Sequence, residues 1–242
     1  MTMRAIVLAG GKGQRLRPYT TVLPKPLMPI GDMPILEVVL RQLKAAGVTR
    51  VTMAVGYLAE LLQAFFGHGE RLGLQIDYSF EDKPLGTVGP LTLIPDLADE
   101  DVFLLMNGDI LCTMDYTSLI RHHRESGAAA TISTFKREVK IDFGVIETDE
   151  TGLLTGYVEK PSFDYRVSMG IYCFDKRALG FLKKGEYCDF PDLIKMLIKA
   201  EEKVASYPFD GYWLDMGRPD DYATAIEEFE SRRSEFLPGE AA

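Results

Sequence analysis

Apolar residues along the first half of the chain follow two alternating patterns. Residues 4–8 form a short apolar run that ends at Gly10, Gly11 and Gly13, which predicts a buried strand opening into a loop. A second pattern begins at Pro34, after which apolar residues recur at helical spacing as far as Gly47. That segment is predicted to be an amphipathic helix.

The two patterns repeat as far as residue 125. Further strands are expected over 51–55, 74–80 and 102–106, and further helices over 58–66, 87–94 and 116–125. Strands that alternate with helices pair in parallel through right-handed crossovers. We therefore predict a three-layer, doubly wound α/β fold with a mostly parallel sheet, whose ligands bind at the carboxyl ends of the strands.

The pattern changes in the second half of the chain. Strands are expected over 128–135, 143–148, 153–158 and 168–174, with a hairpin turn at 149–152 and helices over 191–199 and 220–236. This half is predicted to be a smaller mixed or antiparallel lobe packed against the first. No linker is visible, so we expect one domain over 1–242, with lobes of about 1–125 and 126–219 and a C-terminal helix within 220–242.

Composition and charge narrow the class of protein. The chain has 242 residues, of which 46% are apolar and 26% charged, as in ordinary globular enzymes. Its net charge of −9 argues against non-specific binding to nucleic acid or to an anionic membrane, since both require clustered cations. No apolar run approaches the roughly 20 residues that span a bilayer, so a cytoplasmic protein is expected.

Cysteine and histidine offer no chemistry in this sequence. Cys112, Cys173 and Cys188 are far apart and odd in number, which suggests neither a disulfide framework nor a zinc site. His122 and His123 are adjacent on an expected helix and so point in different directions, while His68 lies in a turn. We expect none of them to act as a base or metal ligand.

The glycine-rich loop after the first strand is the first candidate for phosphate binding. Backbone amides at such a position can surround phosphate oxygens. The loop lacks the GK[ST] ending of a Walker A motif, and Leu16 stands where a dinucleotide fingerprint has its third glycine. Taken alone, the segment is equally compatible with a tight turn that carries a solvated Arg15.

Five further motifs accompany this loop in a fixed order. They are Pro24 to Pro26 (PKP), Leu85 to Thr87 (LGT), Asn107 to Asp109 (NGD), Glu159 to Pro161 (EKP) and Trp213 to Gly217 (WLDMG). With them, the chain closely resembles the sugar-1-phosphate nucleotidylyltransferases, and among these the mannose-1-phosphate guanylyltransferases, from the first strand to about Pro219. The resemblance implies a Rossmann-like nucleotidyltransferase fold.

The resemblance also implies where the nucleotide binds. The GGxGxR loop of the family wraps the triphosphate, and the LGT segment and the residues before it read the base. The nucleotide-binding residues implied here are Leu8, Ala9, Gly10, Gly11, Gly13, Arg15, Glu81, Gly86, Thr87 and Asn107. The catalytic residues are Arg15, which holds the leaving pyrophosphate, Lys25, which steers the attacking phosphate and the α-phosphate, and Asp109.

Two aspartates form the metal site that the resemblance implies. Asp109 follows an expected strand and should project into the crevice, and Asp215 is the second carboxylate. Two hard oxygen ligands together with substrate phosphates and water suit Mg²⁺. Either aspartate alone is just as easily a turn-forming or helix-capping residue.

The sugar phosphate should contact the second half of the chain. Glu159 can accept hydrogen bonds from ring hydroxyls and Lys160 can pair with the phosphate, and Gly144 belongs to the same pocket by resemblance. Family members often carry Asn-x-Gly at the remaining position, where this chain has Ser168 and Gly170. A hydroxyl therefore replaces a carboxamide, which leaves the choice of sugar open.

The reaction implied joins a nucleoside triphosphate to a sugar 1-phosphate and releases pyrophosphate. Glu81 precedes the base-reading segment, and a carboxylate accepts the adjacent N–H donors that guanine presents. GTP and mannose 1-phosphate are thus the favoured substrates. Enzymes that use UTP, CTP or dTTP are alternatives, and Glu81 facing solvent would remove the guanine argument.

A rival of another class is a non-catalytic nucleotide-sugar-binding subunit on the same fold. Such a subunit should have lost charge at the reaction centre, yet Arg15, Lys25, Asp109 and Asp215 are all present. The chain also ends soon after the catalytic core, so functions carried by C-terminal domains of longer relatives are not expected. Homo-oligomers are common in the family, although the sequence identifies no interface.

Overall fold

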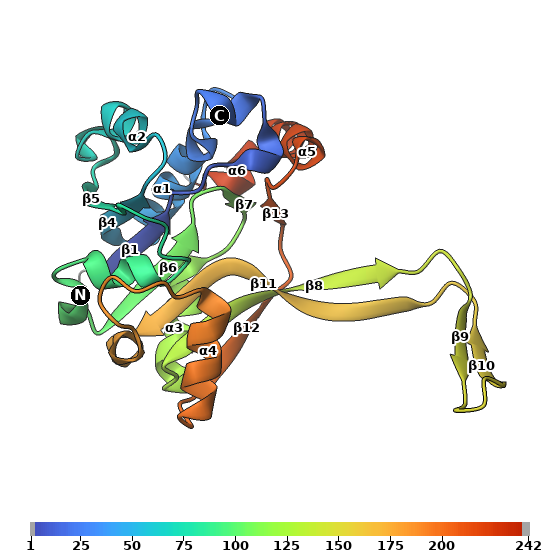
Figure 1. The fold of residues 1–242 in the computed structure, drawn as a ribbon. Helices are drawn as coiled ribbons and strands as arrows, with labels where there is room; N and C mark the ends of the chain where they lie inside the picture. The colour runs from blue at the N-terminus through green and yellow to red at the C-terminus, as the bar shows by residue number, and fades with distance from the viewer. Residues whose placement is uncertain (1–2, 239–242) are drawn as a thin grey trace.

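A seven-stranded sheet forms the centre of the computed structural model, which describes residues 3–238 (Figure 1). Its order is β12-β8-β11-β6-β1-β4-β5. Neighbouring strands are parallel except at β11, which runs antiparallel to both β6 and β8. The strands are β1 (Met3–Leu8), β4 (Val48–Val55), β5 (Gln75–Phe80), β6 (Val102–Asn107), β8 (Ala130–Lys140), β11 (Ser162–Asp175) and β12 (Val204–Phe209). The expected doubly wound, mostly parallel α/β fold is confirmed.

Helices cover both faces of this sheet. They are α1 (Ile35–Ala45), α2 (Ala59–Phe66), α3 (Tyr116–Ser126), α4 (Phe190–Lys199), α5 (Pro219–Ser231) and α6 (Arg233–Phe236). None of the helices among residues 3–238 combines the length and the apolar character needed to span a bilayer.

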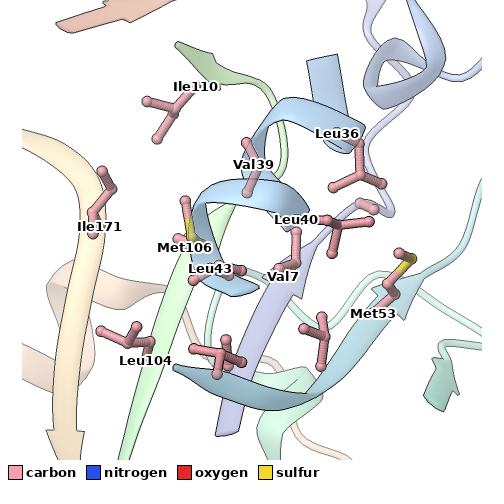
Figure 2. Close-up of a cluster of buried hydrophobic side chains, with 14 of the residues drawn as sticks. Val7, Leu36, Val39, Leu40, Leu43, Met53, Leu104, Met106, Ile110 and Ile171 are labelled. Carbon is pink, nitrogen blue, oxygen red and sulfur yellow. The ribbon is translucent and has the colours of Figure 1, made fainter. Parts of the chain in front are cut away.

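The side chains of β1 alternate between the two faces of the sheet, and each face packs against its own apolar cluster. Val7 faces a cluster that includes Leu40 and Leu43 of α1 (Figure 2), whereas Ile6 points the other way, into a cluster with Leu193 of α4. Successive side chains of a strand point to opposite faces, so a continuous apolar run must be covered on both sides. Helices α1, α2 and α3 share the first layer, and α4 and a 3₁₀ turn over Gly89–Leu93 share the second.

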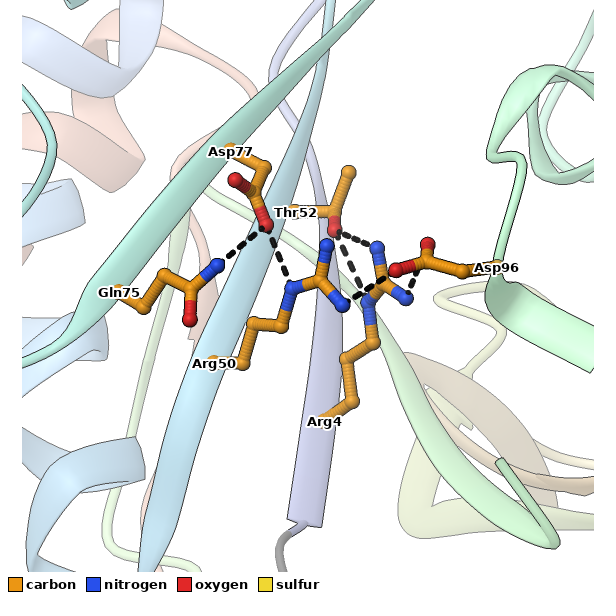
Figure 3. A network of polar contacts seen from close by, with 6 residues as sticks. All are labelled: Arg4, Arg50, Thr52, Gln75, Asp77 and Asp96. Carbon is orange, nitrogen blue, oxygen red and sulfur yellow. Dashed lines mark hydrogen bonds and ion pairs between the residues drawn. The ribbon is translucent and has the colours of Figure 1, made fainter. Parts of the chain in front are cut away.

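An ion-pair network links β1, β4 and β5 near their amino ends (Figure 3). The Arg4 side chain is 2% exposed, and it donates to Thr52 Oγ1 at 2.8 Å and to Asp96 Oδ1 at 2.7 Å. Arg50 pairs with Asp77 at 2.6 Å and also with Asp96. The hydrogen bond from Arg4, followed by that from Arg50, lowers the pKa of Asp96 to about 2. A buried guanidinium is stabilised only when its donors are satisfied, so this cluster is a structural anchor.

The second half of the chain mostly extends the same sheet. Strands β8 and β11 remain paired beyond the body as far as Lys140 and Ser162. At their far end, β9 (Val145–Thr148) and β10 (Leu154–Val158) form the expected hairpin, whose turn is held by Asp149 Oδ1 accepting from the Thr151 and Leu153 amides. Figure 1 shows this extension projecting away from the body. We call residues 134–168 the arm.

Several elements differ from those expected from the sequence. The segment 87–94 is a 3₁₀ turn over Gly89–Leu93, and the helix expected over 220–236 is two helices that break at Arg232. The break lets Phe236 pack edge-on against Tyr212, with ring centroids 5.4 Å apart. Residues 239–242 of the expected C-terminal segment lie outside the described residues.

Short strands that the sequence analysis did not predict complete the fold. Strand β12 contains Pro208, which is tolerated because β12 lies at the edge of the sheet. Two small antiparallel pairs join β2 (Pro29–Ile30) to β3 (Met33–Pro34) and β7 (Ile110–Cys112) to β13 (Trp213–Asp215). The second pair matters most for function, because it carries residue 215 to the end of β6.

Candidate functional site

Two adjoining hollows lie at the carboxyl ends of β1, β4, β5 and β6. One, of about 340 Å³, is lined by the glycine loop, Lys25, Asp109 and Gly217. The other, of about 500 Å³, is lined by Tyr57 and by residues 81–84, 86 and 87. Leu8 and Gly11 line both hollows, so they form one crevice. All ten expected nucleotide-binding residues line it: Leu8, Ala9, Gly10, Gly11, Gly13, Arg15, Glu81, Gly86, Thr87 and Asn107.

Close approaches of the backbone explain the glycines of the loop. Gly13 adopts a left-handed φ of 56°, and a Cβ there would lie 2.9 Å from Thr20 Cγ2. A Cβ on Gly10 would lie 3.1 Å from Glu81 Oε1. Thr20 donates from its hydroxyl to the Gly13 carbonyl at 2.7 Å, and this hydrogen bond holds the loop in place. The loop can thus place its backbone against a ligand without side chains intervening.

Lys25 brings the two expected metal ligands together. Its ammonium is ion-paired with Asp109 Oδ2 and lies 3.5 Å from Asp215 Oδ1. Antiparallel pairing of β7 with β13 sets Asp215 opposite Ile110, directly after the NGD segment. The Lys25 side chain is 11% exposed, so the ammonium compensates both carboxylates in a sheltered position.

Asp109 has one oxygen left over. Within residues 3–238, Asp109 Oδ1 is buried and has no hydrogen-bond partner. A buried, unpaired carboxylate oxygen is costly unless a cation or donor completes it. Among the described residues, no group of three or more His, Cys, Asp or Glu side chains is placed so that it could hold a metal ion. Two carboxylates suit Mg²⁺, which is commonly bound through one or two carboxylates with substrate phosphates and water.

Arg15 packs against the backbone of Gly217. A Cβ at residue 217 would lie 3.1 Å from Arg15 Nη1 and 3.2 Å from Nη2. The Gly217 amide also donates to the Asp215 carbonyl at 2.7 Å, so one tight turn positions both a carboxylate and the guanidinium. The WLDMG motif contains Gly217, but its part in seating Arg15 could not be foreseen without the fold.

Glu81 faces the crevice. Its Oε2 accepts from the Leu85 amide at 2.8 Å, and Oε1 points toward Gly10. Burial raises the pKa of Glu81, and the Leu85 hydrogen bond offsets this only in part. One oxygen therefore holds the 81–85 loop while the other is directed at the hollow.

Two residues outside the sequence expectation shape the same hollow. Asp189 Oδ1 accepts from both the amide and the hydroxyl of Thr87, each at 3.1 Å. Tyr57 lines the hollow and donates from its hydroxyl to the Thr21 carbonyl at 2.9 Å. Tyr57 comes two residues after the end of β4, a positional signal that was available in the sequence. Asp189 is distant along the chain, and only the fold brings it to Thr87.

The expected sugar-phosphate residues divide into two groups. Gly170, with φ 74°, lies so near the crevice that a Cβ would come 2.6 Å from Asn107 Nδ2, and Ser168 is adjacent. Gly144, Glu159 and Lys160 instead lie on the arm and line neither hollow of the crevice. The Glu159 carboxylate accepts a hydrogen bond from the Tyr157 hydroxyl at 2.7 Å. Within a single chain, the three arm residues therefore lie apart from Ser168 and Gly170.

Cys173 and the buried His123 do not line this crevice. Burial raises the pKa of the Cys173 thiol to about 12. His123 is buried and pairs through Nδ1 with Thr131 Oγ1 at 2.8 Å, and burial lowers its pKa to about 4. Both are core residues.

Comparisons with known proteins identify the family. Residues 4–232 match the family model described as nucleotidyl transferase. The chain belongs to this family. It is 35% identical to the UTP–glucose-1-phosphate uridylyltransferase of Synechocystis sp., over 95% of this chain and 64% of the relative. It is 33% identical to the mannose-1-phosphate guanyltransferase of Candida albicans, over 91% of this chain and 62% of the relative.

The fold comparison points the same way. HddC from Yersinia pseudotuberculosis superposes with a TM-score of 0.74 at 24% identity, over 94% of this nucleotidyl transferase family member and 100% of HddC. This likeness concerns the fold. The chain spans 64% and 62% of the lengths of the two curated relatives, so it corresponds to part of each.

Proposed function

We propose that the chain is a sugar-1-phosphate nucleotidylyltransferase, with GTP and mannose 1-phosphate as its substrates and GDP-mannose and pyrophosphate as its products. The observation that carries this proposal is the position of Lys25 between Asp109 and Asp215, at the end of the hollow lined by the glycine loop and Arg15. Cationic side chains and paired carboxylates meet there around a space large enough for phosphates.

The reaction is an in-line displacement at phosphorus. An oxygen of the sugar 1-phosphate attacks the α-phosphorus of the triphosphate, and the bond from that phosphorus to the bridging β-oxygen breaks. The electron pair leaves with pyrophosphate. Orienting two reactants in this way can contribute roughly 7 to 11 kcal/mol of the barrier reduction, so the protein needs no nucleophile of its own.

Arg15 and Lys25 divide the electrostatic work. The Arg15 guanidinium, seated on Gly217, can hold two oxygens of the leaving pyrophosphate as its charge develops. Lys25 can exchange its carboxylate partners for the attacking and α-phosphates, because its ammonium has three donors on a flexible stem. Asp109 and Asp215 would hold Mg²⁺, which supplies charge neutralisation on the phosphate oxygens when bound.

The choice of base rests on Glu81. Its Oε1 is directed into the larger hollow, where a carboxylate can accept from the adjacent N–H groups of guanine. Relatives named as mannose-1-phosphate guanyltransferases support GTP and mannose 1-phosphate. UTP with glucose 1-phosphate is the second candidate, because a relative at 35% identity carries that activity in its name.

A substrate matrix tests the proposal. Pyrophosphate release would be measured with the purified chain, Mg²⁺, and every pairing of GTP, UTP, CTP, dTTP and ATP with common sugar 1-phosphates. We expect the highest kcat/KM for GTP with mannose 1-phosphate. A preference for UTP with glucose 1-phosphate would overturn the assignment of substrates, and no release with any pair would overturn the reaction itself.

A further inference from the structure

The arm carries more than half of the large hydrophobic side chains that are exposed in the described part of the chain. Nine of the seventeen exposed large hydrophobic side chains among residues 3–238 lie on it: Val139, Phe143, Ile146, Leu153, Leu154, Tyr157, Val158, Phe163 and Tyr165. A two-stranded ribbon is marginally stable in water, and clustered apolar surface marks an interaction site. The arm therefore needs a cover.

The arm is straight where it leaves the body. Between Ser168 and Ser162, β11 pairs with β8 residue by residue. The irregularity in this pairing lies between Ser168 and Tyr172, where Gly170 is held against Asn107. That point belongs to the body of the sheet. The β8–β11 ladder is unbroken from Ser168 to Ser162, and the chain bends beyond it, at 141–144 and 159–161, where the β9–β10 hairpin begins. The bend and the hairpin therefore lie at the end of the arm farthest from the crevice of the same chain (Figure 1).

Charge is divided between the two ends of the arm. The hairpin over 145–158 carries Glu147, Asp149 and Glu150 and no Lys or Arg. The two paired strand segments at the root, 134–140 and 162–168, have four basic residues against two acidic ones, Glu138 and Asp164, which pair with Lys140 and Lys136. The root therefore keeps a net positive charge. Two identical arms laid antiparallel would place the acidic end of each toward the basic end of the other, as a two-fold axis requires.

A third hollow opens at the root of the arm. It has a volume of about 480 Å³ and is lined in part by Arg15, Arg137, Trp213 and Asp215. Arg15 and Gly217 also line the crevice, so the hollow adjoins the reaction centre. An arm arriving from an antiparallel copy would bring its bend, residues 159–161, to this hollow, since the two ends of the paired ladder exchange places.

We propose that two copies of this chain associate through antiparallel arms, so that Glu159 and Lys160 of each chain complete the sugar-phosphate site of the other. This inference rests on the proposed function for the role of these two residues. It accounts for two observations together: the apolar arm without a cover, and the separation of Gly144, Glu159 and Lys160 from Ser168 and Gly170.

Sedimentation tests the association without reference to activity. We expect the purified chain to have the mass of two chains. Leu154 is 65% exposed, so Leu154→Arg should fold normally and yet sediment as a single chain, because it places a charge in the apolar contact. A monomeric wild-type protein at micromolar concentration would overturn the proposal, whether or not the chain proves to be an enzyme.

Complementation tests the exchange of residues. Asp109→Asn disables the reaction centre, and the double variant Glu159→Gln/Lys160→Met disables the bend while leaving the net charge unchanged. Each variant alone should be inactive. When the two variants are co-expressed in equal amounts, half of the dimers contain one chain of each. Each such mixed dimer has one site with a wild-type centre and a wild-type bend. About one quarter of wild-type activity should return.

The matched control pairs two lesions of the same centre. Co-expressed Asp109→Asn and Lys25→Met should remain inactive whether the arm acts in its own chain or in the partner, because every site then has a disabled centre. A dimer in which the first pair also stays inactive would show that the arm acts within its own chain and would overturn the proposal. Wild-type activity in the same assay separates that result from a failure of the proposed function, which would show as no pyrophosphate release from the wild-type protein.

Discussion

The ammonium of Lys25 lies 3.5 Å from Asp215 Oδ1 while it is ion-paired with Asp109 Oδ2. One cation thus joins two carboxylates that lie far apart in the sequence. Two carboxylates that share one partner repel each other, and the ammonium offsets this repulsion. Lys25 therefore has two tasks: it stabilises the site without ligand and contacts phosphates when they bind.

Lys25→Met should separate these two tasks. Loss of the ammonium removes its competition for the carboxylates, so the free protein should bind Mg²⁺ more tightly in calorimetric titrations. Turnover should fall by orders of magnitude, because the phosphates lose their cationic guide. An unchanged kcat, or a loss of Mg²⁺ affinity, would contradict this assignment.

Gly217→Ala should impair catalysis while leaving the fold intact. A Cβ would come within 3.1 Å of Arg15 Nη1, and the flexible guanidinium would move by a few tenths of an ångström. We expect kcat to fall by roughly tenfold with an unchanged Tm, since misplaced catalytic groups act less effectively. Gly180→Ala is the control, because a Cβ there meets no atom within 4 Å. Equal kcat in the two variants would mean that Gly217 does not position Arg15 for catalysis.

Glu81→Gln should reduce the preference for GTP. The amide still accepts through its oxygen but presents an N–H₂ group in place of the second acceptor, which suits a base that offers a carbonyl. The ratio of kcat/KM for GTP to that for UTP is expected to fall. A base profile identical to that of the wild-type protein would mean that Glu81 acts only by holding the Leu85 amide.

His123 should make the fold sensitive to mild acid. Burial lowers its pKa from 6.5 to about 4, so folding favours the neutral ring. The stability that the neutral His123 ring gives the folded state is present in full above pH 6.5 and is lost as the pH falls toward 4. The loss in the free energy of unfolding amounts to roughly 3 kcal/mol. Asp96, with a pKa lowered to about 2, contributes in a separate window below pH 3.8.

The measurement is Tm as a function of pH for His123→Gln. This variant should lose less Tm between pH 6.5 and 4 than the wild-type protein does, because no ring remains to be protonated. His68→Gln is the control, since His68 is exposed. Parallel Tm curves for wild type and His123→Gln would contradict the account.

Much of the fold follows from local patterns in the sequence. The apolar run at residues 4–8 and the helical spacing after Pro34 predict β1 and α1, because strands buried on both faces and amphipathic helices leave distinct periodicities. Strands β12 and β13 were missed. The first contains Pro208 and half-exposed positions, and the second is three residues long, so their pairing depends on tertiary partners.

The site was predictable where a motif follows a strand, and not where distant segments meet. Asp109 could be placed because it comes two residues after the end of β6. The contact of Arg15 with Gly217 and that of Thr87 with Asp189 arise from folding alone. The position of Lys160 was also beyond the sequence, since pairing of β8 with β11 determines how far the arm extends.

The most direct test of the account is the Mg²⁺ dependence of pyrophosphate release by wild type, Asp109→Asn and Asp215→Asn. With GTP and mannose 1-phosphate, we predict release only when Mg²⁺ is added, and rates lower by orders of magnitude in both variants. Asp101→Asn is the control, since Asp101 pairs with Lys176 near the opposite end of β6. A near-normal rate in either of the two variants, or wild-type release without any divalent cation, would contradict the shared cation site.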